Sequence, residues 1–98
     1  MKISLVEGPR RCRLIAEGKL IAPWVAEFVN AGKKAIDSLH GRELIIDLRG
    51  VTAVSPEGES ALVQLIRKNV RFQCGIFMRE LFKRLARTRP DEESPGRT

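Results

Sequence analysis

The feature that most constrains the fold is a short apolar run, Glu43–Leu48, near the middle of the chain. Its centre, Leu44-Ile45-Ile46, lacks the alternation of apolar and polar residues that marks a half-exposed strand. A run of this kind is typical of a parallel sheet whose two faces are both covered. Neighbouring parallel strands need a long crossover, usually a helix. The run therefore predicts an α/β fold.

Helical patterns flank this run on both sides. Apolar residues recur at helical spacing from Pro23 to Leu39, and Gly41 provides a stop. A second helix is predicted to open at Ser55-Pro56-Glu57, because Ser55 can cap it and Pro56 suits its first turn. Asn69 is expected as its left-handed stop. A third helical pattern covers residues 76–87.

Three further strands complete the prediction. Residues 2–6 and 11–17 are joined by a Gly-Pro turn, which favours an antiparallel hairpin. Apolar and polar residues alternate over residues 70–74, which predicts the last strand. Residues 18–22 and 49–54 are expected to be loops. The predicted fold is a mixed four-stranded sheet in the order β-β-α-β-α-β-α, with parallel crossovers and an antiparallel first strand. It forms one domain, residues 1–88, followed by a flexible tail, residues 89–98.

Composition is that of an ordinary globular domain. The chain has 98 residues, of which 43% are hydrophobic and 31% charged, so a core is expected without disulfides or metals. Cys12 and Cys74 lack the spacing of zinc or redox motifs and are expected to be small buried hydrophobic residues. No signal peptide or membrane span is visible, which predicts a cytoplasmic protein without membrane insertion.

Residues suited to catalysis are sparse. The single histidine, His40, lies at a predicted helix end, and no nucleophile, nucleotide-binding or metal motif occurs. Glu57 and Glu59 are paired carboxylates, but both fall in a first helical turn, where acids are favoured by the helix dipole. We therefore expect no enzyme activity, no catalytic residue, no metal and no cofactor.

The net charge of +6 is unevenly distributed, since Glu80 is the single acid between Arg67 and Arg89. Arg79, Lys83 and Arg87 are spaced four apart, which predicts one exposed stripe on the third helix, with Arg84 close by. A solvated helix face explains this stripe, and a nucleic-acid surface is the alternative. Stacking on bases would need aromatic residues on the same surface. The aromatic residues here mostly fall at predicted core positions, with Phe82 as the expected exception; they are Trp24, Phe28, Phe72, Phe77 and Phe82.

The segment Ile46–Gly58, IDLRGVTAVSPEG, resembles the STAS domain family of bacterial anti-sigma factor antagonists and sulfate transporters. In that family a strand ends in Asp-Leu-x-x-Val, and Asp-Ser-Ser-Gly or Asp-Ser-Thr-Gly leads into a helix. Residues 17–20 and 74–85 are also similar, so the resemblance covers about residues 2–87. The residue before the glycine is the family's phosphoacceptor, and here it is Glu57, preceded by Pro56 and Ser55. The resemblance implies a variant that is not phosphorylated at this position.

The resemblance implies a regulatory protein-interaction domain whose partner is an anti-sigma kinase-like protein or another ATPase subunit. One alternative is a structural subunit of an ATPase-containing transport or signalling complex, and another is a nucleic-acid binder using the basic helix. The sequence does not decide between a monomer and a homo-oligomer, nor whether Ser55 or Ser60 is phosphorylated instead. The expected partner-binding residues are Arg49, Val54, Ser55, Pro56, Glu57, Gly58 and Glu59.

Overall fold

The computed structural model describes residues 1–87, apart from the side chains of Phe77 and of residues 85–87. The predicted flexible tail, residues 89–98, lies outside the described residues. The elements follow the predicted order and are β1 (Lys2–Glu7), β2 (Arg11–Leu20), α1 (Trp24–Asp37), β3 (Glu43–Val54), α2 (Pro56–Gln64), β4 (Val70–Gln73) and α3 (Ile76–Arg87).

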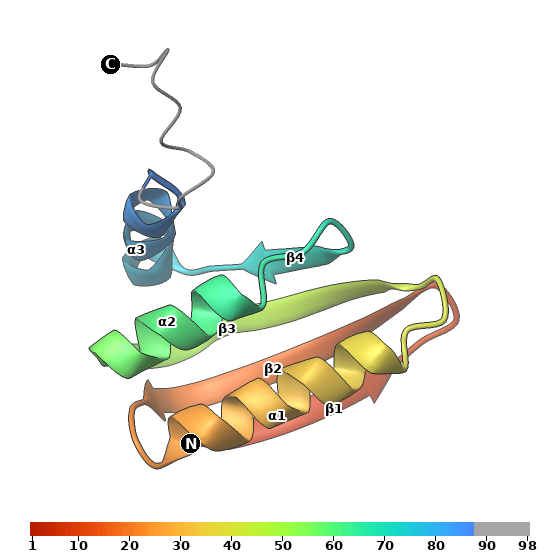
Figure 1. Cartoon of the computed structure of the whole chain (residues 1–98), viewed down its shortest axis with the longest axis horizontal. Coiled ribbons are helices and arrows are strands. Elements are labelled where there is room, and N and C mark those ends of the chain that lie inside the picture. The colour runs from red at the N-terminus through yellow and green to blue at the C-terminus, as the bar shows by residue number, and fades with distance from the viewer. Residues whose placement is uncertain (88–98) are drawn as a thin grey trace.

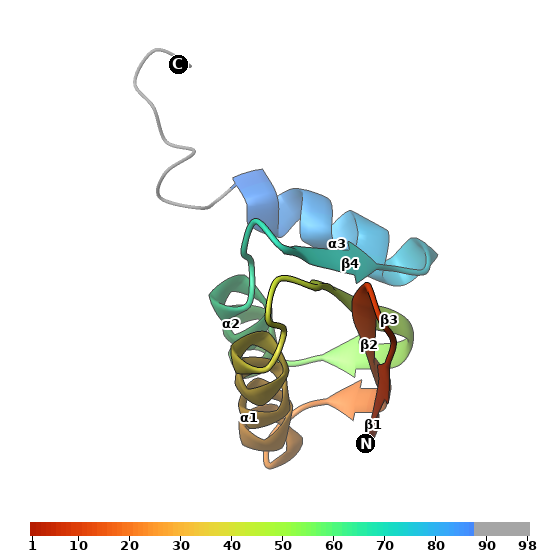
Figure 2. The ribbon, with the colours of Figure 1, turned by 90° about the vertical axis from the view of Figure 1, so that its right-hand side faces the viewer.

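The four strands form one sheet in the order β1-β2-β3-β4 (Figure 1). The first pair is antiparallel, and both β2–β3 and β3–β4 are parallel. This confirms the predicted α/β fold with its mixed sheet and antiparallel first strand. Figure 2 shows α1 and α2 on one side of the sheet and α3 at the edge formed by β4. Within the described residues no helix is long and apolar enough to span a membrane.

The core lies between the sheet and the pair α1 and α2. Alternate residues of β2 and β3 face these helices and are fully buried, as are Phe28 of α1 and Leu62 of α2. The two helices also pack closely at Gly32 of α1 and Leu65, the residue after α2. A Cβ on Gly32 would lie only 2.8 Å from Leu65 Cδ1. The fully buried strand residues of this layer are Leu14, Ala16, Leu44, Ile46 and Leu48.

The opposite face of the sheet corrects one expectation. The view of Figure 2 shows no helix of residues 1–87 over this face, so the prediction that β3 is covered on both sides is wrong. Its central residue on this face, Asp47, is nevertheless only 5% exposed. The side chains of Arg13 and Arg49 are ion-paired with it. Long arginine stems can shield a strand from solvent as a helix would, so Asp47 is buried without a second layer of helices.

The two predicted loops, 18–22 and 49–54, are largely strand. Pairing of β2 with β3 continues from Glu17↔Gly50 to Leu20↔Val54, with register shifts on either side of Gly18. Gly18 has a φ of +109°, which an L side chain rarely adopts. These irregularities disrupt the alternation of apolar and polar residues. The sequence pattern therefore predicted strands that are shorter than those in the structure.

The predicted end of the second helix is also wrong. α2 ends at Gln64, and Leu65 donates its N–H to the Leu62 carbonyl at 3.1 Å. Asn69 is not in a left-handed conformation; among the non-glycine residues described, that conformation is found at His40, with a φ of +51°. His40 is exposed and precedes Gly41, as the predicted stop after α1 requires.

Candidate functional site

The start of α2 is the region that the sequence singled out, and it is held by a capped junction. Ser55 is the N-cap, and its Oγ accepts a hydrogen bond from the Gly58 N–H at 3.1 Å. The Ser55 N–H donates to the Leu20 carbonyl at 3.1 Å. The junction therefore ties the first turn of α2 to the end of β2.

Gly58 fixes this contact further. A Cβ at Gly58 would lie 2.5 Å from the Leu20 carbonyl oxygen and 2.9 Å from Val54 Cγ1. Neither contact is sterically possible, so only glycine allows the helix to approach the end of β2 this closely. The glycine of the predicted motif thus has a packing role at this junction.

The two acids of the first turn differ in their surroundings. Glu57 is exposed, as is Pro56, so both are available to a partner. Glu59 is partly buried and forms an ion pair with Arg84 of α3 at 3.4 Å. This pair lies in a shallow groove that also includes Val54, Glu80 and Leu81. Glu57 is therefore the acid of this turn that projects freely, and Glu59 joins two helices.

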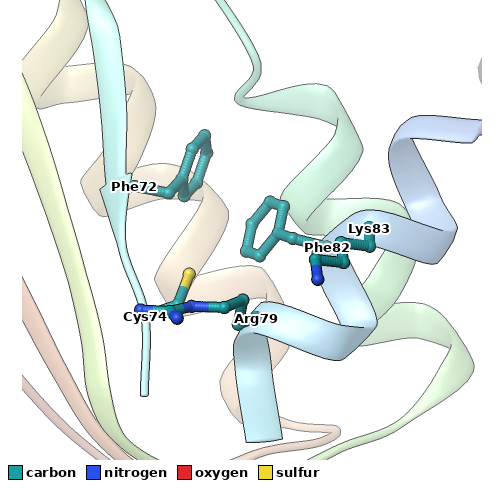
Figure 3. A pocket seen from close by; sticks show the side chains of 5 residues that line it. All are labelled: Phe72, Cys74, Arg79, Phe82 and Lys83. Carbon is teal, nitrogen blue, oxygen red and sulfur yellow. The ribbon is translucent and has the colours of Figure 1, made fainter. Parts of the chain in front are cut away.

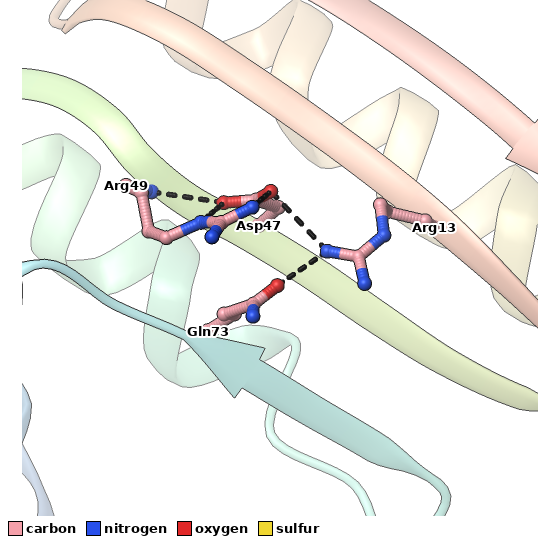
Figure 4. A network of polar contacts seen from close by, with 4 residues as sticks. All are labelled: Arg13, Asp47, Arg49 and Gln73. Atoms are coloured by element: carbon pink, nitrogen blue, oxygen red, sulfur yellow. Dashed lines mark hydrogen bonds and ion pairs between the residues drawn. The ribbon is translucent and has the colours of Figure 1, made fainter.

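Arg49, which was expected beside these residues, belongs to a different cluster. Its Nε and Nη2 atoms donate to the Asp47 Oδ1 and Oδ2 atoms at 3.0 and 2.8 Å. Arg13 binds the same carboxylate at 3.2 Å and also donates to the Gln73 side chain (Figure 4). The hydrogen bonds from Arg49 are the main cause that lowers the pKa of Asp47. This network joins β2, β3 and β4 on the open face, away from the start of α2.

Trp24 is a surface residue that the sequence reasoning missed. It was expected in the core, yet the residue is 39% exposed. Trp24 opens α1, and Figure 1 shows that α1 and α2 begin at the same end of the sheet. The sequence contained a signal for this exposure, because Trp24 directly follows Pro23 at the start of the helix. It therefore comes one turn before Phe28, the first buried residue of α1. We refer to Trp24, Val54, Pro56, Glu57 and Glu59 as the helix-start surface.

The predicted basic stripe lies at another edge of the molecule. Arg79 and Lys83 are exposed and line one hollow of about 450 Å³ (Figure 3). Arg84 points instead toward Glu59, and the side chain of Arg87 lies outside the described residues. Phe82, the expected exposed aromatic residue, is partly buried against the core.

The cysteines and the histidine have ordinary surroundings. Cys12 is buried as predicted, whereas Cys74 is only partly buried, and both are free thiols. Burial raises the pKa of the Cys74 thiol. Among the described residues no group of histidine, cysteine, aspartate and glutamate side chains is arranged to hold a metal ion.

No family model matches the sequence, and no curated protein matches it either. Among solved structures, the chain is similar to one described as "Crystal Structure Analysis of Mglu", with a TM-score of 0.59 and 15% sequence identity. The match covers 72% of this chain and 18% of the Mglu chain, so it involves a minor part of that protein. At this identity the likeness concerns the fold alone. The chain is therefore a small α/β domain with a mixed four-stranded sheet, similar in fold to a part of Mglu.

Proposed function

We propose that this chain is a bacterial, cytoplasmic STAS-like domain that regulates or assembles with a protein partner and does not catalyse a reaction. The observation that carries the proposal is the junction between β3 and α2. It holds the Asp47-Leu48 strand, the capping Ser55 and the packed Gly58 in the order that the STAS resemblance implies. Glu57, at the family's phosphoacceptor position, is exposed at the start of the helix.

The charge at this position is permanent. A phosphate group would add about −1.5 to −2 charges near the positive end of a helix, whereas the Glu57 carboxylate adds a single charge. The Ser55 hydroxyl is already engaged as the helix cap at 3.1 Å from the Gly58 nitrogen. A docking surface with these features is always in one charge state, which suits constitutive binding better than a switch.

Trp24 gives this surface an apolar anchor. Tryptophan is enriched among the residues that dominate binding energy at protein interfaces. Trp24 opens α1, and the exposed Pro56 and Glu57 open α2, and these two helices begin at the same end of the sheet (Figure 1). An apolar pocket flanked by a cationic group would complement them. From the STAS resemblance, the partner is an anti-sigma kinase-like protein or another ATPase subunit.

A photo-crosslinking residue placed at position 57 tests the proposal in the cells that make the protein. The matched control carries the same residue at position 37, an exposed acid near the other end of α1. We expect position 57 to capture one protein that position 37 does not. With that protein purified, Trp24→Ala should weaken binding about tenfold or more, the range of interface hot spots.

The charge is tested in the same purified complex. Glu57→Ala should weaken binding, Asp37→Ala should not, and incubation with ATP should leave the affinity unchanged. Phosphate found by mass spectrometry on Ser55 or Ser60 would contradict a fixed charge. Equal binding by wild type and Glu57→Ala would reduce Glu57 to a residue that stabilises the helix.

A structural subunit is the alternative function, and it would dock on its partner through the same surface at the start of α2. A stoichiometric complex that survives high salt favours a permanent subunit of a transport or signalling ATPase, because exposed charge pairs are screened under those conditions. A complex that dissociates and re-forms readily favours a regulator.

A further inference from the structure

The hollow between β4 and α3 combines an aromatic floor with cations. Phe72 of β4 and Phe82 of α3 pack with ring centroids 4.7 Å apart at an interplanar angle of 42°. Figure 3 shows the Cys74 thiol beside these rings, with Arg79 and Lys83 projecting from α3. The five residues line an open surface hollow of about 450 Å³, a volume within the range of small-molecule sites.

The electrostatics of this hollow favour an anion. α3 has no acid in its first turn, and the Arg79 N–H donates to the Gly75 carbonyl at 2.9 Å, so Arg79 lies in that turn. A cation at the positive end of a helix is unfavourable, and Lys83 adds a second positive charge one turn later. The nearest acid on the helix, Glu80, contacts Lys83 at 3.9 Å, with both side chains mainly exposed. Such a pair contributes little to stability. Glu80 offsets one of the two cations, so the described residues around the hollow leave one net positive charge.

A compact anion fits this site better than a polyanion. Around the helix the cations are interrupted by Glu80 and by the Glu59–Arg84 pair, so they do not form a continuous track for a phosphate backbone. Phe72 and Phe82 pack against each other and are partly buried. They form an apolar floor rather than exposed platforms on which successive bases could stack.

We propose that this hollow binds a small organic anion that has a flat apolar body and a single acidic head group. The body packs on Phe72 and Phe82, and the head group lies between Arg79 and Lys83. Each cation pairs with the head group without a covalent step. The site lies at the β4 edge and is independent of the proposed docking by the start of α2.

Titration with 1-naphthoate, followed by ¹H–¹⁵N NMR of the full chain, tests this proposal. We expect saturable shifts concentrated at residues 72–83 and smaller shifts at residues 54–59. The matched neutral probe, 1-naphthalenemethanol, should bind at least about fivefold more weakly, and the affinity for naphthoate should fall with added salt. Equal affinity for the two probes, or shifts spread over the whole chain, would overturn the proposal.

Variants locate the head group. Arg79→Gln and Lys83→Gln should each weaken naphthoate binding about twofold to fivefold, as expected for an exposed ion pair. Arg84→Gln is the control, because Arg84 is on the same helix but faces Glu59. A change that is the same for all three variants would mean that only net charge matters and would overturn the site.

Cys74 provides an independent readout. Because Cys12 is 2% exposed, a disulfide reagent such as DTNB should modify Cys74 first, and bound naphthoate should slow that reaction several-fold. An unchanged rate at saturating naphthoate would place the anion elsewhere.

Binding of a (dT)₁₂ oligonucleotide tests the nucleic-acid alternative. Tighter binding of (dT)₁₂ than of naphthoate, with a steep salt dependence, would replace this proposal with a nucleic-acid surface.

Discussion

The starts of α2 and α3 each follow a parallel strand closely, but they are stabilised in different ways. α2 begins two residues after β3 ends, with a serine cap, acids in its first turn and a glycine packed on the Leu20 carbonyl. α3 follows β4 through Cys74 and Gly75, has no acid in its first turn and has Arg79 there instead. The first helix start is electrostatically satisfied by its own residues, and the second is not.

The strands before these helices also differ in support. The end of β3 pairs with Leu20 through the backbone. Gln73 at the end of β4 pairs with Asp47 in the same way, and its side chain also accepts a hydrogen bond from Arg13, which is ion-paired with Asp47 (Figure 4). The start of α2, whose positive helix end is balanced by its own acids, suits a preformed protein-docking surface. A helix start with unbalanced cations beside an apolar hollow suits a ligand that supplies the missing negative charge.

The largest expected effect is at Gly58, the glycine of the α2 junction. Gly58→Ala should destabilise the fold by about 3 kcal/mol, because the new Cβ would meet the Leu20 carbonyl oxygen and the packed helix must shift. Gly75→Ala is the matched control, since its Cβ would find the Arg49 carbonyl oxygen at an ordinary 3.7 Å. Urea denaturation of both variants measures the difference. Equal losses would mean that the α2 junction is no tighter than the α3 junction.

Asp47→Asn should cost about 2 kcal/mol at neutral pH, the scale of hydrogen bonds to a charged group. The hydrogen bonds from Arg49 lower the pKa of Asp47 in the folded state, so its stabilising contribution is complete above the unfolded pKa of about 4. The contribution is lost as the pH falls through the lowered folded pKa. Urea denaturation of wild type and variant from pH 7 to pH 3 should show the gap between them narrowing. A gap that stays constant over this range would contradict the ionic support of β4.

The helix cap should have an intermediate effect. Ser55→Ala removes the acceptor for the Gly58 N–H and should destabilise the protein by about 1 kcal/mol. Ser60→Ala, at an exposed position within the same helix, should be neutral or slightly stabilising because alanine is the better helix former. Thermal unfolding of the two variants compares them directly. A loss at Ser60 as large as that at Ser55 would remove the special role of the cap.

The smallest effects concern the first-turn charges and should have opposite signs. Glu57→Gln should cost about 0.3–1 kcal/mol because it removes a favourable charge from the start of α2. Arg79→Gln should leave stability unchanged or raise it by a few tenths of a kcal/mol, roughly the lower end of the same interaction. Both differences should shrink in high salt. Chemical denaturation at low and high salt checks them, and a clear loss of stability in Arg79→Gln would show that Arg79 is structurally required.

Much of the fold was predictable because local patterns and tertiary structure agree. The Gly-Pro turn, the helical spacing after Pro23 and the Ser55-Pro56-Glu57 helix start each specify one element locally. The sequence failed where irregular pairing hid the pattern. Past Gly18 and Gly50 the chain continues as strand, because β2 and β3 pair across register shifts that no local period reveals.

The candidate site was predictable only along the chain. The capping residue and the first-turn acids of α2 were identified correctly from their order, because a helix start is a local structure. Arg49 was placed beside them by proximity in sequence, yet its side chain pairs with Asp47 on the open face. Trp24 was assigned to the core because its periodicity fits, although it opens α1 and is 39% exposed, whereas Phe28, one turn later, is fully buried.

By itself, the sequence determined the order of elements, the mixed sheet, the cap of α2 and the excess of positive charge along α3. These properties depend on near neighbours and on composition. Tertiary structure alone decided that Asp47 is neutralised by two arginines, that Glu59 is paired with Arg84, and that Arg79 and Lys83 share a hollow with Phe72 and Phe82. Each of these depends on segments far apart in the chain, whose distances are set by strand register and helix packing rather than by sequence spacing.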